Sequence, residues 1–124
     1  MSNPICWFEI YVQDMNRAKT FYESVFETRL SKLESPDAKM DGWTFTMEEK
    51  DYGSTGALVR MEGVPSGGNS TLVYFACDDC SVQANRTADH GGKVFKEKSS
   101  VGQYGFISLV FDTEGNMIGL HSMK

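Results

Sequence analysis

The sequence lacks an excess of positive charge, a long apolar stretch and a charged leader. Its 124 residues include 12 Lys and Arg against 17 Asp and Glu, which leaves a net charge of −5 at pH 7. A chain of this sign is poorly suited to bind nucleic acid or an anionic membrane. The N-terminus has no basic segment followed by an apolar one, and no stretch elsewhere is long enough to span a bilayer. We therefore expect a cytoplasmic protein without a nucleic-acid or membrane partner.

Cysteine and histidine are also scarce. The chain has three cysteines and two histidines, and the odd number of cysteines fits reduced thiols better than a disulfide framework. Cys77 and Cys80 have the CxxC spacing of a metal site, but no second pair of Cys or His completes it, so we interpret this spacing as incidental. A GxSxG elbow, a P-loop and a GxGxxG motif are all absent from the sequence, which therefore does not indicate the chemistry of those motifs.

What the sequence does contain is one order of elements, used twice. In the first half, alternation at residues 5–12 predicts a strand, and Asp14 stands where the N-cap of a helix is expected. Residues 43–47 and 56–61 predict further strands. The helix after Asp14 has apolar side chains at helical spacing, which we expect to pack in the core: Met15, Ala18, Phe21, Tyr22, Val25 and Phe26.

The second half repeats this order after the Gly- and Ser-rich linker 63–70. A strand at 71–77 leads to Asp79 as the N-cap of a helix that ends before Gly91 and Gly92. Strands are predicted at 93–97, 104–111 and 117–122. Neither half, at about 60 residues, is expected to be stable alone. The sequence thus predicts one α+β domain, 1–124, in which two βαβββ modules (about 4–62 and 71–124) form a cupped mixed sheet with the helices outside.

Several short motifs occur in a recognisable order: Val12-Gln13-Asp14, Phe21-Tyr22, Gly91-Gly92-Lys93-Val94 and Asp112-Thr113-Glu114-Gly115-Asn116. In this order and spacing the chain resembles the vicinal oxygen chelate superfamily, which includes glyoxalases, bleomycin-resistance proteins and ring-cleaving dioxygenases. The resemblance covers almost the whole chain. One local departure is Phe26-Glu27, where the family usually has a glycine after the helix. The resemblance implies paired βαβββ modules around a central cavity, and a homodimer.

For the metal-using members, the resemblance implies four ligands at equivalent strand positions. Counted from the motifs, these positions hold Trp7, Arg60, Leu72 and Gly119. None of these side chains is a usual metal donor, because the guanidinium of arginine stays charged. We therefore expect no metal cofactor. The alternative is a divalent metal displaced by one pleat and held by Glu9, Glu62 and His121, with Tyr74 on the same face.

Alternation along the strands then predicts which side chains face the cavity. The predicted ligand-binding residues are Trp7, Glu9, Tyr11, Arg60, Tyr74, Gly119 and His121. We expect Arg60 to be buried and to pair with Glu9, or else to receive an anionic group of a ligand. Gly119 is expected to leave open space on the cavity floor, with His121 at its edge.

Three functions follow from these observations. The first is non-catalytic binding of a small, partly aromatic or anionic molecule in the cavity, as in the drug-sequestering branch of the superfamily. The alternative is a metal-dependent lyase or dioxygenase that uses the shifted site. The third is a structural or regulatory role without a small ligand. Metal content and a ligand-dependent change in the environment of Trp7 distinguish the three.

Overall fold

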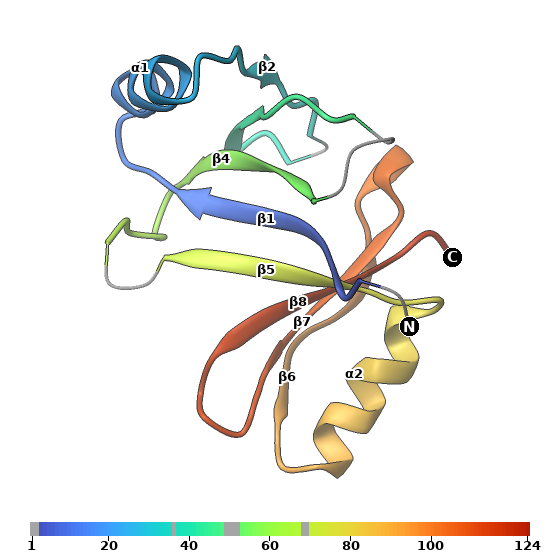
Figure 1. The fold of residues 1–124 in the computed structure, drawn as a ribbon. Coiled ribbons are helices and arrows are strands. Elements are labelled where there is room, and N and C mark those ends of the chain that lie inside the picture. The colour runs from blue at the N-terminus through green and yellow to red at the C-terminus, as the bar shows by residue number, and fades with distance from the viewer. Residues whose placement is uncertain (1–2, 36, 49–52, 68–69) are drawn as a thin grey trace. The chain divides into compact units, whose positions relative to one another are not determined.

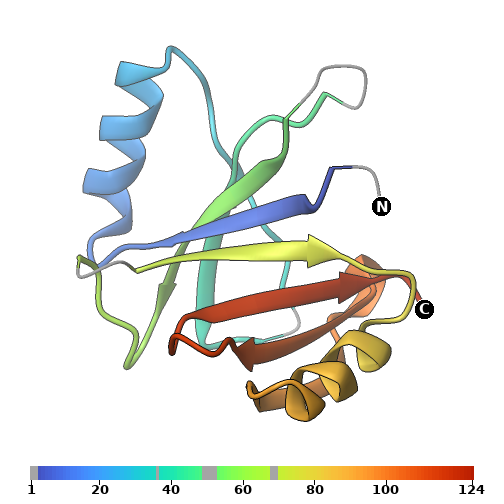
Figure 2. The ribbon, with the colours of Figure 1, turned by 60° about the horizontal axis from the view of Figure 1, so that its bottom comes forward.

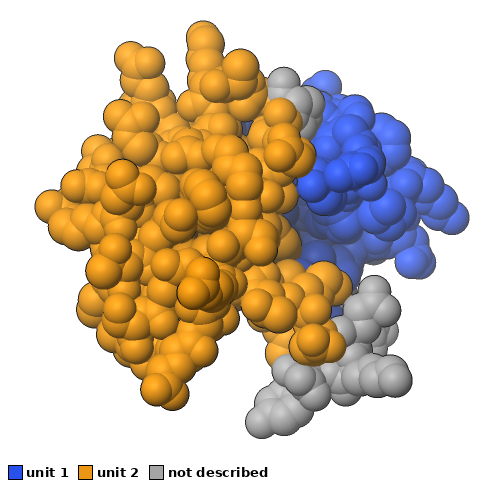
Figure 3. All heavy atoms as spheres, turned by 90° about the horizontal axis from the view of Figure 1, so that it is seen from above, with its two compact units in different colours: residues 1–6, 72–124 blue, residues 7–71 orange. Residues whose placement is uncertain are grey.

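The helices and strands follow the predicted order, apart from a two-residue strand at Ser31–Lys32 and a 3-10 helix at Gly102–Tyr104 that were not predicted, as a computed structural model of the chain shows (Figure 1). It describes residues 3–35, 37–48, 53–67 and 70–124. These residues fall into two units, which Figure 3 colours separately. Unit 2 is Trp7–Thr71, and unit 1 joins Leu72–Lys124 to the start of the chain up to Cys6. In the described ranges, no helix is both long enough and apolar enough to cross a bilayer.

Unit 2 contains a βαβββ series. Its elements are β1 (Ile5–Tyr11), α1 (Met15–Val25), β2 (Ser31–Lys32), β3 (Met40–Thr44) and β4 (Thr55–Met61), and residues 5–6 of β1 are counted with unit 1. The strands lie in the order β2-β3-β4-β1, with β1 parallel and β3 antiparallel to β4. Asp14 caps α1 as predicted, because its carboxylate accepts a hydrogen bond from the backbone N–H of Arg17 at 3.1 Å.

The core of unit 2 lies between α1 and one face of the strands. Its buried residues are joined by partly buried side chains from the strands and from α1: Val12, Met15, Leu30 and Leu58, with Ile10, Ala18, Tyr22, Trp43 and Phe45. Side chains along a strand alternate between the two faces. The register pairs Trp7 with Thr55, Glu9 with Ala57, and Tyr11 with Val59. These six side chains therefore share the face that α1 does not cover.

Three apolar side chains that were expected in this core lie outside it. Phe21, Val25 and Phe26 are 56%, 55% and 63% exposed, so that prediction is wrong for them. The helical period gives the reason, because the buried stripe follows Ala18 and Tyr22, and Phe21 lies roughly 100° around the helix from Tyr22. Phe26 stands at the C-cap, just before Glu27, whose φ of 50° is the conformation for which a glycine is usual.

Unit 1 repeats the series. It contains β5 (Thr71–Ala76), α2 (Cys80–Asp89), β6 (Lys93–Ser100), a short 3-10 helix η1 (Gly102–Tyr104), β7 (Phe106–Phe111) and β8 (Met117–Ser122), and the first residue of β5 is counted with unit 2. The order is β5-β8-β7-β6, with β5 parallel and β7 antiparallel to β8. Tyr104 belongs to η1 and not to a strand, because Gly105 takes a φ of 100° and interrupts the extended run. The start of the chain is held here by a 2.9 Å hydrogen bond from the Ala76 N–H to the Pro4 carbonyl.

The second helix packs on one face of its own strands. Figure 2 shows α2 against β6, β7 and β8, and the buried core between them consists of Cys80, Ala84, Val110 and Leu120. The β5–β8 register pairs Tyr74 with Gly119 and Ala76 with His121. These four residues alternate with core residues and lie on the face turned away from α2. Each unit is thus a βαβββ series with its helix on one face of a mixed sheet, which confirms the predicted α+β class.

Candidate functional site

Three of the predicted site residues are joined by hydrogen bonds on β1, on the face that α1 does not cover. Glu9, at the centre of the strand, is only 9% exposed. Its Oε2 accepts a hydrogen bond from Trp7 Nε1 at 3.2 Å, and its Oε1 accepts one from Tyr11 Oη at 2.7 Å. Residues two apart on a strand point the same way, which brings the three side chains together. Two aromatic neighbours thus hold the carboxylate in one orientation.

Tyr11 is the donor in the shorter of these bonds. Burial of the phenol raises the pKa of Tyr11 well above its usual value, and the negative charge of Glu9 and the hydrogen bond to it raise this pKa further. The phenolate form is therefore disfavoured at physiological pH. Tyr11 can orient Glu9 as a hydrogen-bond donor, but it is not suited to act as a general base.

Arg60 does not join this group. Its side chain is exposed, and its Nε donates a hydrogen bond to the backbone carbonyl of Gln13 at 3.1 Å. The register sets Ala57 beside Glu9, so Arg60, three residues further along β4, points to the opposite face. The predicted buried pair between Glu9 and Arg60 is therefore wrong. Leu58, two residues before Arg60, lies on the same side of β4 and packs in the core beneath α1.

In unit 1, Tyr74 and Gly119 form a close pair across β5 and β8. A Cβ atom at residue 119 would overlap ring atoms of Tyr74, which is itself only 5% exposed. The expectation of open space at Gly119 is therefore wrong, because the Tyr74 ring already occupies it. A glycine is required here for the close approach of an aromatic ring to the backbone of the neighbouring strand.

His121 lies two residues after Gly119 on β8, and one nitrogen of its ring is hydrogen-bonded. Its Nε2 lies 2.6 Å from the carbonyl oxygen of Tyr104, so Nε2 carries the proton that it donates to this oxygen. In the neutral ring, Nδ1 is then the nitrogen that can accept a hydrogen bond. The carbonyl of His121 accepts a 2.8 Å hydrogen bond from the Cys77 N–H. Both ends of the residue are thereby fixed, and Nδ1 is its available acceptor.

The side chains present do not fit the metal site that the resemblance implies. The four expected ligand positions hold Trp, Arg, Leu and Gly, none of which is a usual donor. Within residues 3–35, 37–48, 53–67 and 70–124, no three His, Cys, Asp or Glu side chains are grouped so that they could hold a metal ion. Glu62, part of the alternative metal set, is exposed in the turn after β4. No reaction step through a metal follows from these residues.

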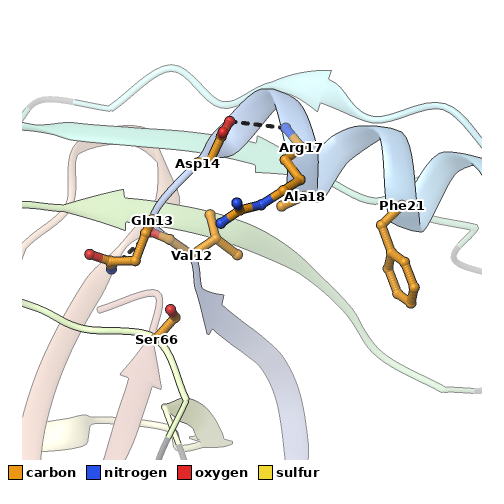
Figure 4. A pocket seen from close by; sticks show the side chains of 7 residues that line it. All are labelled: Val12, Gln13, Asp14, Arg17, Ala18, Phe21 and Ser66. Carbon is orange, nitrogen blue, oxygen red and sulfur yellow. Dashed lines mark hydrogen bonds between the residues drawn. The ribbon is translucent and has the colours of Figure 1, made fainter.

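A hollow that the sequence did not predict lies at the start of α1 within unit 2 (Figure 4). Its volume is about 320 Å³, and it is lined by Val12, Gln13, Asp14, Arg17, Ala18, Phe21 and Ser66. Figure 4 shows Arg17 extended towards Val12, and the Phe21 ring further along the helix. The sequence signal nearest to it is the Val12-Gln13-Asp14 motif, but that motif is explained by the end of β1 and the helix cap. None of the predicted ligand-binding residues lines this hollow.

Comparison with known proteins identifies the class. Residues 5–120 match the model of the Glyoxalase/Bleomycin resistance protein/Dioxygenase superfamily, so the chain belongs to this superfamily. Among curated proteins, it is similar to CFP32 of Mycobacterium bovis and of Mycobacterium tuberculosis, whose name assigns them only provisionally as glyoxylases. The identity is 26% over 119 residues, covering 92% of this chain and 43% of each relative. The chain thus spans less than half the length of these relatives.

Solved structures of other proteins share the fold of this chain. The chain is similar to the BH1468 protein of Bacillus halodurans, with a TM-score of 0.75, 12% identity, and coverage of 100% of this chain and 96% of that one. It is also similar to methylmalonyl-CoA epimerase of Mycobacterium tuberculosis, with a TM-score of 0.72, 13% identity, and coverage of 98% and 88%. At these identities the likeness shows a shared fold and does not transfer an activity.

Proposed function

We propose that this protein binds a small, partly aromatic molecule, without a metal, at the face of β1 that carries Trp7, Glu9 and Tyr11. The observation that carries the proposal is the state of Glu9, a carboxylate that is 9% exposed and whose two oxygens are each held by an aromatic side chain. Ligand sites combine a few fixed polar groups with aromatic surface in this way. Membership of a superfamily that includes bleomycin-resistance proteins is consistent with a binding function.

The residues of this site have separate roles in the proposal. Trp7 is partly buried and supplies ring surface for contact with the ligand. Tyr11 holds Glu9 in place, and Glu9 receives a polar group of the ligand. Tyr74 and His121 belong to unit 1 and are not part of this β1 site; they stay separate predictions of ligand contact, the Tyr74 ring as an apolar surface and Nδ1 of His121 as a hydrogen-bond acceptor.

Thermal stability with and without small aromatic probes tests this proposal. Phenol, indole and benzyl alcohol serve as probes, because a ligand that binds only the folded state raises Tm, and at a given concentration a tighter ligand raises it more. At least one probe should raise the Tm of the wild type, and this increase should persist after dialysis against EDTA. A Trp7→Leu variant should lose the increase. Trp43→Phe is the matched control, since Trp43 packs with the α1 core of unit 2.

Two outcomes would contradict the proposal. An equal Tm increase in Trp7→Leu and Trp43→Phe would place the ligand away from β1. Loss of binding on EDTA dialysis, restored by one equivalent of a divalent metal, would instead favour the alternative of a metal-dependent lyase or dioxygenase with a shifted site.

A further inference from the structure

The hollow at the start of α1 brings a side-chain cation next to apolar surface within unit 2 (Figure 4). Arg17 supplies the cation, and Val12, Ala18 and Phe21 supply the apolar surface. The volume of about 320 Å³ lies at the lower end of the range of pockets that hold small molecules. The hollow therefore has room for a molecule with a single ring.

The guanidinium of Arg17 distinguishes this hollow from an ordinary helix start. The backbone N–H of Arg17 already donates to the Asp14 carboxylate at 3.1 Å, and the Ala18 N–H donates to the Asp14 carbonyl at 3.0 Å. These amides of the first turn are therefore occupied. By contrast, none of the residues that the structure describes forms a hydrogen bond or an ion pair with the Arg17 guanidinium. Its planar fork of N–H donors suits the two oxygens of a carboxylate.

Hydrogen bonds fix part of the wall of the hollow, at the end of β1. The carbonyl of Gln13 accepts a hydrogen bond from Arg60 Nε at 3.1 Å, and its Nε2 donates to the Val64 carbonyl at 3.0 Å. The N–H of Val12 donates to the Val59 carbonyl at 2.9 Å. The end of β1 is thus tied to β4 and to the turn after it. This part of the lining is formed before a ligand arrives, which reduces the entropic cost of binding.

Of the lining residues that the structure describes, two are charged, and they have different roles. Asp14 is the cap of α1, and its charge opposes the binding of an anion. Arg17 favours an anion, and so does the guanidinium of Arg60, which is bonded to the carbonyl of a lining residue. The fork of Arg17 is therefore the group that holds a ligand, and removal of the Asp14 charge should strengthen its hold.

The cation and the ring surface lie side by side on the helix. Arg17 and Phe21 are four residues apart on α1, so their side chains are neighbours on its surface. Phe21 is 56% exposed, and a flat ring placed against it removes apolar area from water. The spacing of about one helical turn suits a molecule whose carboxylate is attached directly to a ring.

We propose that this hollow is a second binding site, which takes a small aromatic carboxylate. The carboxylate forms two hydrogen bonds with the guanidinium of Arg17, and the ring lies against Phe21. The site is separate from the β1 face that carries Trp7, and it does not depend on the binding function proposed there.

Three probes of one skeleton test this site: benzoate, benzyl alcohol and benzylamine at pH 7, which are anionic, neutral and cationic. Two-dimensional ¹⁵N NMR follows the backbone amides of Ala18 and Ser66, which line the hollow, and the indole N–H of Trp7, which reports on the β1 face. The Trp43→Phe variant distinguishes the two indole resonances. Benzoate should shift both amides and bind at least about fivefold more tightly than benzyl alcohol, and benzylamine should bind most weakly.

Matched variants assign this preference to Arg17. Arg17→Gln removes the charge at an exposed helix position where glutamine is also favourable, so benzoate and benzyl alcohol should then bind within about twofold of each other. Arg29→Gln removes the same charge at an exposed position outside the hollow and should leave the fivefold preference unchanged. Asp14→Asn keeps a good helix cap and should tighten the binding of benzoate.

A second pair of variants tests the ring contact. Phe21→Ala should weaken benzoate and benzyl alcohol alike, because both lose the same aromatic partner. Phe26→Ala is the matched control, since Phe26 is 63% exposed but does not line the hollow. Equal affinities of the two variants for benzoate would refute the ring contact.

The remaining outcomes separate this site from the β1 face. The site is refuted if benzyl alcohol or benzylamine binds the hollow as tightly as benzoate, if the preference survives in Arg17→Gln, or if Asp14→Asn weakens benzoate. If benzoate shifts the indole N–H of Trp7 and neither amide, it binds at the β1 face, which supports the function proposed there and refutes this site. If benzoate shifts none of these resonances, this site is refuted, and the neutral probes alone judge the β1 face.

Discussion

At the scale of single residues, Gly119 is a position where one added carbon would overlap a buried side chain. The ring of Tyr74 lies over its backbone, and a Cβ atom would overlap three atoms of that ring. Tyr74 is 5% exposed and Gly119 is buried, so neither has free space into which it could move. The two residues therefore act as one packing unit between β5 and β8.

A substitution at this glycine should destabilise the protein even though valine is a good strand residue. Gly119→Val is expected to lower the free energy of unfolding by about 1–3 kcal/mol, the usual cost of overpacking. Urea unfolding of Gly119→Ala, Tyr74→Leu and the double variant measures the coupling. The double variant should lose clearly less stability than the sum of the two single losses. Strict additivity would show that the ring does not occupy the space above residue 119.

At the scale of elements, the start of α2 is held by one carboxylate with several partners. Asp79 Oδ1 accepts hydrogen bonds from the backbone N–H of Ser81 at 3.0 Å and from its hydroxyl at 2.7 Å. The same oxygen lies 3.0 Å from Nζ of Lys98 on β6. This cap therefore joins α2 to a strand of its own sheet, in addition to starting the helix.

The cap should make stability depend on acid pH. The hydroxyl of Ser81, followed by Lys98 and the Ser81 N–H, lowers the pKa of Asp79 from 3.8 to about 2 in the folded protein. Because the folded pKa is the lower one, the stabilisation is complete above the unfolded value and is lost as pH falls from about 4 to about 2. Chemical unfolding of wild type and Asp79→Asn across this range should show a steeper loss in the wild type. Identical acid profiles would contradict this role.

The C-terminal end of α1 departs from the pattern that is usual in the superfamily. The helix stops at Phe26, and Glu27 adopts a positive φ with its side chain exposed. This is the position where the superfamily resemblance led us to expect a glycine, which adopts such a φ at no steric cost. Glu27, the residue found in place of the usual glycine, thus adopts the positive φ at which a glycine is common after a helix.

At the scale of the whole molecule, exposed apolar side chains support the expected self-association. Phe21, Val25 and Phe26 near the end of α1, and Phe95 on β6, are between 55% and 63% exposed. β6 also stands at the end of the strand order, where a strand can pair further. We predict a homodimer, which sedimentation at micromolar concentration should show as about twice the 13.9 kDa chain mass. A single species of 13.9 kDa under these conditions would refute it.

The sequence by itself determined the order of the two α-helices and of the longer strands, because its signals are local. Alternation, helical spacing, the Asp14 and Asp79 caps and the Gly91-Gly92 stop each depend on neighbouring residues only. The same local signals correctly placed Tyr74 and His121 on one face of unit 1. They also placed Glu9 between Trp7 and Tyr11, since positions two apart on a strand share a face.

Only the tertiary structure decided the register between strands and the packing of rings against backbone. A shift of one residue in the pairing of two strands turns every side chain of the shifted strand to the other face. The alternation along β4 was predicted correctly, but the face that each residue takes was not. Arg60 therefore lies outside the site. The space at Gly119 is filled by Tyr74, a residue 45 positions earlier in the chain. Contacts of this kind depend on where distant segments meet, which no pattern within a single segment records.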